Sequence, residues 1–286
     1  MVTVDSWCTT LNKVCKSKFR EWLRMRAILV INSKGGSGKT TLTTNLASYY
    51  ASKNFKTAIM DYDPQGSSLH WLKMRPNSVE KIHGANAAAQ KSTPLRTVHM
   101  WVPEDTEILI IDAPAGAKGL LLQELVRKSH FILIPVAPSS IDIHATADFV
   151  KELFLFGGAR TSKAKIAVVA NRVRSASTVY ESLQRFLISL KLPFLSTISD
   201  SHNYLHAVEK GLGVFEMDEE STVVERQELM PIFKWVDGIL PGSVALDDDG
   251  KVVAIDRSGK FAAMRTGGKS LISTILTATG RFKKLP

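Results

Sequence analysis

The sequence predicts a three-layer α/β fold, in which a mostly parallel, twisted β-sheet is flanked by helices on both faces. Buried strands alternate with helices along the chain, which is the order that a parallel sheet requires. Glycine and polar residues directly follow several of these strands, and parallel sheets bind ligands beyond the carboxyl ends of their strands. The 286 residues, 44% of them hydrophobic and 22% charged, suit one such domain with additions at its ends.

The first strand is expected over residues 26–32, an apolar run that leads into a glycine-rich turn. The helix after it is expected over 40–52, because Leu42, Leu46 and Tyr49 have the spacing of one helical face. The same alternation continues along the chain. Further strands are expected over 57–63, 107–112, 131–136, 165–170 and 194–198, and helices over 118–128, 143–155 and 177–190.

The two ends of the chain do not follow this alternation. Residues 1–24 are basic, and we expect either an amphipathic helix or an upstream, misassigned start, since Met25 stands directly before the first strand. Residues 240–286 begin at a Pro-Gly break, continue with a hairpin expected around Asp247–Gly250, and close in a basic tail. The expected organisation is therefore an N-terminal extension at 1–24, a main domain at 25–239 and a C-terminal appendage at 240–286.

The net charge of +10 restricts the classes of partner. A surplus of this size attracts polyanions, either nucleic acid or an anionic membrane surface. Cys8 and Cys15 lack the spacing of a metal site or a disulfide framework, which favours a reducing, cytoplasmic setting. No apolar run approaches the ~20 residues that a membrane-spanning helix needs.

Residues 33–41 have the pattern of a phosphate-binding loop, G-x-x-x-x-G-K-[ST], with Ser33 at the first glycine position. Glycines let backbone amides converge on phosphate oxygens, and the following helix adds its dipole. Lys39 is expected to reach the β- and γ-phosphates, and Thr40 to bind magnesium through its hydroxyl. The loop predicts a site for ATP and Mg²⁺ that is formed by Lys34, Gly35, Gly36, Ser37, Gly38, Lys39, Thr40 and Thr41.

Lys34 places a second lysine inside this loop. A loop that wraps around its own nucleotide in the usual way keeps such a lysine from the γ-phosphate of that nucleotide. The side chain could instead reach a nucleotide across a subunit interface, or it could be a solvated loop lysine. The segment alone leaves both interpretations open.

Three motifs, taken in order, resemble those of the ParA/MinD family of positioning ATPases. Residues 32–41 resemble the deviant Walker A motif of that family, residues 61–67 resemble its first switch, and residues 108–116 resemble its Walker B strand and second switch. The resemblance covers roughly residues 25–235. It implies a weak ATPase that forms a homodimer with ATP sandwiched between the subunits, and that an adaptor protein stimulates.

The resemblance also implies roles for individual residues. Lys34 corresponds to the signature lysine that acts on the ATP of the partner subunit, and Asp63 to the residue that orients the hydrolytic water. Lys34, Lys39 and Asp63 are therefore the expected catalytic residues. Asn171, at the end of the fifth expected strand, matches a position that often contacts adenine.

Thr40, Asp61 and Asp112 would support magnesium, directly or through water, if the resemblance holds. A carboxylate at the end of a buried strand beside a phosphate loop is costly to desolvate without a cation, and a magnesium ion provides one. The alternative for Asp61 is an ordinary strand-end cap. The alternative for Asp63 is a turn residue, since Pro-Gln-Gly follows it.

Members of the family differ in what the dimer binds. The charge surplus favours non-specific, salt-sensitive contacts with the DNA backbone, although residues 200–204 lack an arginine that DNA-binding relatives often have there. A MinD-like membrane helix is disfavoured, because Gly267, Gly268 and Gly280 interrupt the C-terminal tail. A metabolic ligase of the dethiobiotin or cobyrinate type would need a substrate-binding segment between the switches, and none is recognisable.

Within the family, the second switch and the region 219–235 most resemble the orphan, cargo-positioning branch of ParA, which includes the carboxysome-distribution ATPases. This resemblance implies a cytoplasmic, nucleoid-associated protein. The cargo would be a carboxysome, a plasmid or chromosome, or a protein cluster. The stimulating adaptor would be of the ParB or McdB kind.

Overall fold

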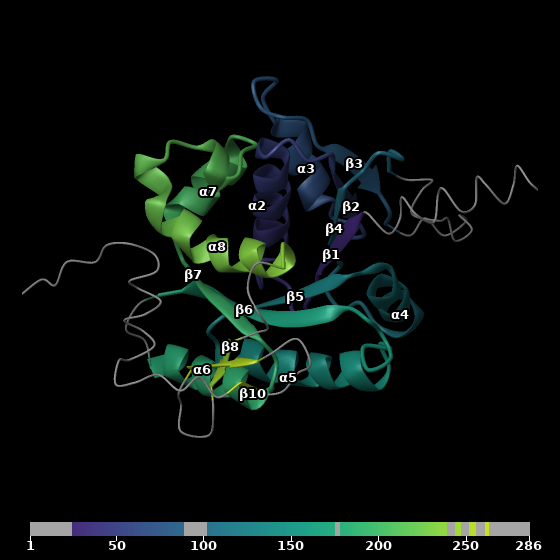
Figure 1. The fold of residues 1–286 in the computed structure, drawn as a ribbon, viewed down its shortest axis with the longest axis vertical. Helices are drawn as coiled ribbons and strands as arrows, with labels where there is room; N and C mark the ends of the chain where they lie inside the picture. Colours follow the sequence, from purple (N-terminus) through teal and green to yellow (C-terminus); the bar gives the residue numbers. More distant parts are fainter. Residues whose placement is uncertain are drawn as a thin grey trace, which may run out of the picture.

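The computed structural model describes residues 25–88, 102–174 and 178–238, and three short strands at 244–246, 252–255 and 261–262. The predicted three-layer α/β fold is confirmed: a seven-stranded sheet lies between two layers of helices (Figure 1). The strand pairings within this sheet are parallel. The expectations for residues 1–24 and for the basic tail lie outside the described residues.

The strands have the order β3-β2-β4-β1-β5-β6-β7 across the sheet. β1 (Arg26–Val30) lies in the middle, between β4 (Ile108–Asp112) and β5 (Phe131–Val136). These three strands are almost wholly buried and rich in Ile, Leu and Val, as expected where helices cover both faces of a sheet. The outer strands are β2 (Thr57–Asp61), β3 (His83–Asn86), β6 (Lys165–Val173) and β7 (Phe194–Ser199).

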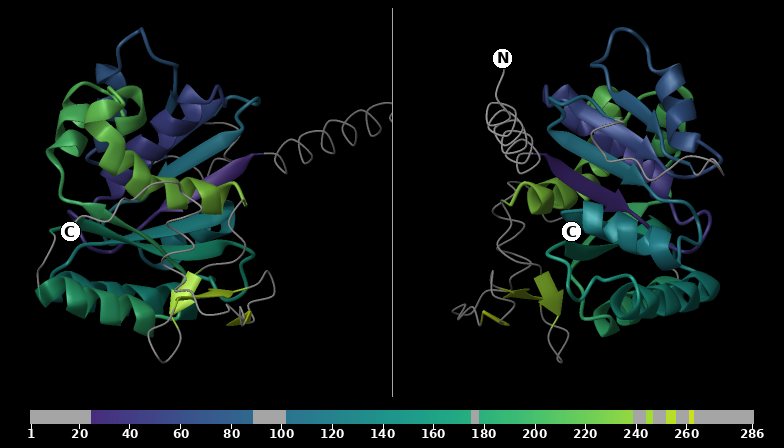
Figure 2. Two further views of the ribbon diagram at one scale, coloured as in Figure 1. Left: turned by 60° about the vertical axis from the view of Figure 1, so that its left-hand side comes forward. Right: turned by 90° about the vertical axis from the view of Figure 1, so that its right-hand side faces the viewer.

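Each face of the sheet has its own helical layer and its own hydrophobic core, as the views in Figure 2 show from two further sides. The first layer centres on α2, whose Leu42, Leu46 and Tyr50 are buried against the sheet. It consists of α2 (Lys39–Ser52), α3 (Ser67–Met74), α7 (His202–Glu209) and α8 (Val223–Val236), with short 3₁₀ turns at Val214–Glu216 and Glu220–Thr222. The second layer consists of α4 (Gly119–Lys128), α5 (Ser140–Leu155) and α6 (Thr178–Ser189).

The elements predicted from the sequence are present, but several ends differ. β2 ends at Asp61 instead of residue 63, because the Asp63 N–H donates to Asp61 Oδ1 at 2.9 Å and starts a turn. α5 begins at Ser140, three residues earlier than expected, since the Ser139 hydroxyl accepts the N–H of Asp142 and caps the helix. β6 continues to Val173, beyond its expected end. β3, α3, α7 and α8 were not predicted.

Near the C-terminus, β8 (Val244–Leu246), β9 (Val252–Ile255) and β10 (Phe261–Ala262) form a separate three-stranded sheet. β8 and β9 pair antiparallel, as the two arms of the expected hairpin would. The turn expected at residues 247–250 lies outside the described residues. The division of the chain at 24 and 239 stays a prediction.

Candidate functional site

The glycine-rich loop between β1 and α2 forms an open cradle at the carboxyl edge of the sheet. Gly35 and Gly36 are exposed, and among the described residues no atom beyond their chain neighbours lies within 4 Å of where their Cβ atoms would be. Gly38, at the N-terminus of α2, has a φ of 94°, a conformation that favours glycine. The first turn of α2 has neither a capping side chain nor an acidic residue. Its backbone amides therefore favour an anion from outside the helix.

Lys39 brings a cation into this cradle. Its side chain is buried, and Nζ donates a hydrogen bond of 3.0 Å to the carbonyl oxygen of Lys34. Burial lowers the pKa of Lys39, while the charges of Asp112 and Asp63 act in the opposite direction. A buried ammonium group is costly to desolvate without an anion, and a phosphate bound in the loop would supply one.

Asp61 and Asp112 meet behind the loop, where they are register partners at the ends of β2 and β4. Both side chains are buried, with exposed fractions of 0% and 2%. Asp112 Oδ2 accepts a hydrogen bond of 3.2 Å from the Thr40 hydroxyl, and Asp61 Oδ2 accepts one of 2.7 Å from the Ser68 hydroxyl. Burial, together with the charge of Asp61, raises the pKa of Asp112 to about 7. Two buried carboxylates beside a hydroxyl form a set of oxygens that a magnesium ion favours.

Asp63 lies on the turn after β2 and is partly exposed. Its Oδ1 accepts the N–H of Gln65 at 2.9 Å, so the turn interpretation describes its present contacts. Asp61 Oδ2 accepts the N–H of Leu69 at 3.3 Å, near the start of α3, and this contact agrees with the capping interpretation of Asp61. These contacts are compatible with the predicted roles toward water and magnesium, which stay predictions.

Asn171 lies against the phosphate loop. Its Nδ2 donates a hydrogen bond of 2.8 Å to the carbonyl oxygen of Ser37, and a Cβ atom on Gly38 would lie 1.8 Å from Nδ2. Glycine at position 38 is therefore required by this contact as well as by its φ angle. The contact of Asn171 with adenine stays a prediction.

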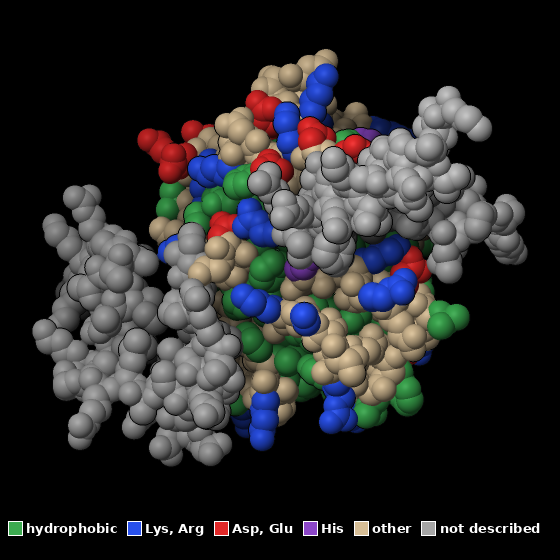
Figure 3. Space-filling model, turned by 45° about the vertical axis from the view of Figure 1, so that its right-hand side comes forward, with side chains coloured by type: hydrophobic (Ala, Val, Ile, Leu, Met, Phe, Trp, Pro, Cys, Tyr) green, Lys and Arg blue, Asp and Glu red, His purple; other side chains and the backbone are tan. Residues whose placement is uncertain are grey.

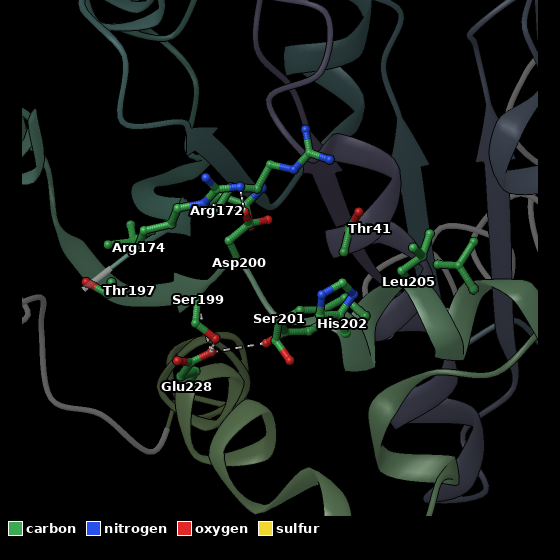
Figure 4. A pocket seen from close by; sticks show the side chains of 14 residues that line it. Thr41, Arg172, Arg174, Thr197, Ser199, Asp200, Ser201, His202, Leu205 and Glu228 are labelled. Carbon is green, nitrogen blue, oxygen red and sulfur yellow. Dashed lines mark hydrogen bonds and ion pairs between the residues drawn. The ribbon is translucent and has the colours of Figure 1, made fainter. Parts of the chain in front are cut away.

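A cavity of about 1030 Å³ adjoins the loop at the carboxyl ends of β6 and β7 (Figure 4). Thr41 of α2 lines it together with residues of α7, which lie on the same side, and with Glu228 of α8. Asp200 pairs with Arg174 at 2.9 Å, and Glu228 Oε2 accepts hydrogen bonds of 3.0 Å from the N–H and the hydroxyl of Ser199. Its volume, and a lining that combines apolar side chains with a few polar ones, suit a nucleoside next to a phosphate site.

Sequence reasoning missed the lining residues on β7, directly after it and on α8. The one available signal was their position after a strand of a parallel sheet, where ligands bind. The missed residues are Thr197, Ser199, Asp200, Ser201, His202, Tyr204, Leu205, Val208 and, from α8, Glu228.

The residues of the site fit a magnesium nucleotide. The hydroxyl of Ser37 is buried and has no hydrogen-bond partner among the described residues, as expected of a group that awaits a ligand. Lys39 and the loop amides would hold the phosphates. In the described ranges, no group of three or more His, Cys, Asp or Glu side chains could hold a metal alone. A cation here would therefore rest on Thr40, the two carboxylates and phosphate oxygens.

Within the part of the chain that the structure describes, every helix is too short or too polar to cross a bilayer.

Comparison with known proteins identifies several relatives. The maintenance of carboxysome distribution protein A of Halothiobacillus neapolitanus is 27% identical over 191 residues, which cover 66% of this chain and 87% of that protein. The protein of the same name from Gloeobacter kilaueensis is 26% identical over 133 residues, which cover 46% of this chain and 59% of the relative.

Among solved structures, a Cyanothece McdA variant in complex with ATP superposes with a TM-score of 0.53 and 14% identity, over 75% of this chain and 97% of that one. MinD of Pyrococcus horikoshii with Mg-ADP gives a TM-score of 0.55 and 19% identity, with the same coverage of both chains. At these identities the likeness concerns the fold.

The CobQ/CobB/MinD/ParA nucleotide-binding domain model matches residues 28–214. These residues include the phosphate loop, both buried carboxylates and Asn171. The predicted resemblance to the ParA/MinD family is thereby confirmed. Since the match covers more than half of the chain, the chain belongs to the CobQ/CobB/MinD/ParA family of nucleotide-binding proteins.

Proposed function

We propose that this chain is an ATPase that dimerises with ATP, binds DNA without sequence specificity and positions an intracellular cargo. The observation that carries the proposal is the phosphate loop, in which Lys39 contacts the backbone of a second lysine, Lys34, and lies near the buried carboxylate of Asp112. Membership of the family supports nucleotide binding by this domain. The second lysine is what separates a dimer switch from an ordinary phosphate site.

Each part of the site has a role in this proposal. Lys39 and the loop amides hold the phosphates of the subunit's own nucleotide, and Thr40 with Asp112 supports the magnesium ion. The cavity beside Asn171 takes the nucleoside. Mg·ATP, when bound, supplies the γ-phosphate whose loss lets the two switch segments relax. Asp63, on the first of these segments, orients the water.

The segment Lys34–Gly36 forms the crest of the loop, and it is the surface on which two copies would meet. Gly35 and Gly36 are exposed and have open space above them. Lys34 directly precedes them, so its ammonium group can reach a nucleotide held by the second copy. ATP then lies between the two subunits, and the dimer lasts until hydrolysis.

The charge distribution supports DNA binding on the side of the molecule formed by α4, α5 and α6. Residues 118–191 contain eleven Lys and Arg, nine of them without Arg172 and Arg174 at the cavity, against five Asp and Glu, whereas residues 192–238 contain three against nine. Figure 3 shows part of this asymmetry: the charged side chains toward the bottom of the face are Lys and Arg, whereas both signs are mixed toward the top. A basic surface of this kind binds the DNA backbone through counterion release.

Several of these cations lie at the amino edge of the sheet, opposite the phosphate loop. Arg160 and Lys163 precede β6, and Lys191 precedes β7; all three are exposed. In a dimer that closes on the nucleotide edge, both amino edges face outward. DNA could therefore bind without disturbing the ATP interface.

The cargo is proposed from the relatives. Two of them carry the name of carboxysome distribution, so a carboxysome is the first cargo to test. Its positions in cells with and without this gene, seen by a fluorescent shell protein, test the assignment. Even spacing that persists without the gene would exclude this cargo. The proposed setting is the cytoplasm, on the nucleoid, with a McdB-like or ParB-like adaptor that stimulates hydrolysis.

Co-sedimentation with DNA and with anionic liposomes, each in the presence of ATP or ADP, tests the proposal. We expect ATP-dependent binding to DNA that is lost at high salt. Binding to liposomes alone would refute the DNA-based function and favour a MinD-like protein. No ATP dependence on either surface would refute the switch.

A further inference from the structure

The end of β6 has an irregular backbone where it faces the phosphate loop. Ala170 pairs with Thr197 on β7 and Val173 pairs with Ser199, so β6 contains one extra residue between these two pairs. Within this bulge, Arg172 has a φ of 57°, which is left-handed and rare for a residue with a side chain.

The bulge lets two consecutive residues reach the same loop. Neighbouring side chains on a regular strand point to opposite faces. Here Asn171 Nδ2 donates to the carbonyl oxygen of Ser37 at 2.8 Å, and Arg172 Nη1 donates to that of Gly36 at 3.4 Å. Two successive carbonyl groups of the loop are thus held by two successive residues of β6. Figure 4 shows Arg172 at the side of the cavity that adjoins Thr41.

These contacts hold the crest of the loop at its end, where Gly36 is followed by Ser37. Lys34 stands at the start of the same crest. Two further hydrogen bonds fix the crest. The Lys34 N–H donates to Asn32 Oδ1 at 3.4 Å, and Lys39 Nζ donates to the Lys34 carbonyl at 3.0 Å. Lys39 is also the side chain that a phosphate attracts, so nucleotide binding competes for its bond to Lys34. Arg172 bonds a different carbonyl, that of Gly36, so its contact does not depend on the Lys39 ammonium.

We propose that Arg172 is a positioning residue for Lys34: its guanidinium holds the Gly36 carbonyl, and so keeps the crest in the conformation that presents Lys34 to a second subunit. The inference rests on the proposed ATP-dependent dimer. A left-handed conformation at a residue with a side chain costs folding free energy, and such strain persists where the surrounding structure and its function require it. Glycine would fit this left-handed backbone best. What arginine adds at position 172 is its guanidinium group.

The test uses the substitutions R172G and R172K. Glycine adopts a φ of 57° without strain, so R172G keeps the bulge, removes the guanidinium and should unfold at a higher temperature than the wild type. Because Arg172 also lines the cavity proposed for the nucleoside, a fluorescent ADP analogue gives the affinity of each variant, and dimerisation is compared at saturating ATP. At saturation we expect R172G to weaken the ATP-dependent dimer about tenfold, the effect of losing roughly one hydrogen bond to a charged group. R172K retains a donor and should recover part of the dimer.

A double-variant cycle with K34A separates this inference from the proposed function. If Arg172 acts through Lys34, then R172G weakens the dimer of wild type but has no further effect on K34A. Additive effects would show that Arg172 acts independently, and would overturn the inference. Wild-type dimerisation of R172G, with K34A monomeric, would overturn the inference and leave the proposed function intact. Normal dimerisation of K34A would overturn both.

Discussion

Lys39 Nζ donates a hydrogen bond of 3.0 Å to the backbone carbonyl of Lys34, so the two lysines of the phosphate loop contact each other directly. The ammonium group of Lys39 thus ties the end of the loop to the backbone of Lys34, near its start. A phosphate group that enters the cradle competes for this ammonium with the carbonyl of Lys34. Nucleotide binding therefore changes the restraint on the segment that carries the second lysine, and the two side chains can be separated by experiment.

Lys39→Ala should weaken nucleotide binding by roughly 100-fold. The substitution removes the buried cation of the cradle, and a charge-assisted contact with phosphate contributes up to ~3 kcal/mol, or roughly 100-fold in affinity. Titration with a fluorescent ATP analogue measures the loss. Lys53→Ala, at an exposed position just after the same helix, is the control and should bind as wild type does. Binding by the Lys39 variant at wild-type affinity would exclude a phosphate contact.

Lys34→Ala should leave ATP binding within about fivefold of wild type, since a partly exposed charge contributes little to binding within its own subunit. The ATP-dependent dimer, in contrast, should weaken by roughly 30-fold or more, because the variant cannot form the proposed charge pair with the nucleotide of the second subunit. Analytical ultracentrifugation with ATP and with ADP measures both states. A Lys34 variant that dimerises normally would refute the cross-subunit role.

Asp63→Ala should bind ATP and dimerise but hydrolyse ATP roughly 100-fold more slowly, as expected when the group that orients the attacking water is removed. The dimer should then persist with ATP. Phosphate release under single-turnover conditions measures the rate. Asp105→Ala removes an exposed carboxylate in another turn and serves as the control. A wild-type rate in the Asp63 variant would leave Asp63 as a turn residue only.

Asp112 should make the stability of the nucleotide-free protein depend on pH. Its pKa is raised to about 7 in the fold, so the stabilisation of the protonated form is present at low pH and is lost as pH rises through 7. The thermal unfolding midpoint without ligand should therefore be lower at pH 8 than at pH 5.5. Magnesium favours the ionised carboxylate, so the increase in midpoint with Mg·ADP should be larger at pH 8.

Asp112→Asn is the control for this prediction, because it keeps the shape of the side chain and removes the charge. The variant should unfold at a higher temperature than wild type at pH 8 without ligand, and should lose the magnesium-dependent part of the stabilisation by ADP. An equal pH dependence in the variant and the wild type would assign the titration to another group.

The triple variant R160A/K163A/K191A should weaken DNA binding without affecting ATP binding or dimerisation, since these residues lie at the edge of the sheet opposite the loop. If all three contact phosphates, the slope of log K against log salt should fall by about 2 to 3. The control K73A/K81A/K210A makes the same change of net charge at exposed positions elsewhere. Equal losses in the two triples would exclude a localised DNA surface.

The sequence by itself determined the phosphate loop and the strands that carry the carboxylates. A loop of glycines followed by Lys-Thr and a helix encodes its function in contiguous residues, because backbone φ angles and local amides make the site. Asp61 and Asp112 were recognisable because each ends a continuous buried run. Such a run can be identified as a strand without knowing which other strand it pairs with.

The tertiary structure decided which distant residues meet. Thr40 contacts Asp112 across 72 positions and Asn171 contacts Ser37 across 134, and no local pattern reports either pair. β3 was missed because His-Gly-Ala-Asn has neither apolar alternation nor a buried run, so only pairing with β2 makes it a strand. The left-handed Arg172 depends in the same way on the pairing of β6 with β7. The local backbone conformation depends mainly on neighbouring residues in the sequence. Strand register and contacts between distant residues form only when the sheet assembles.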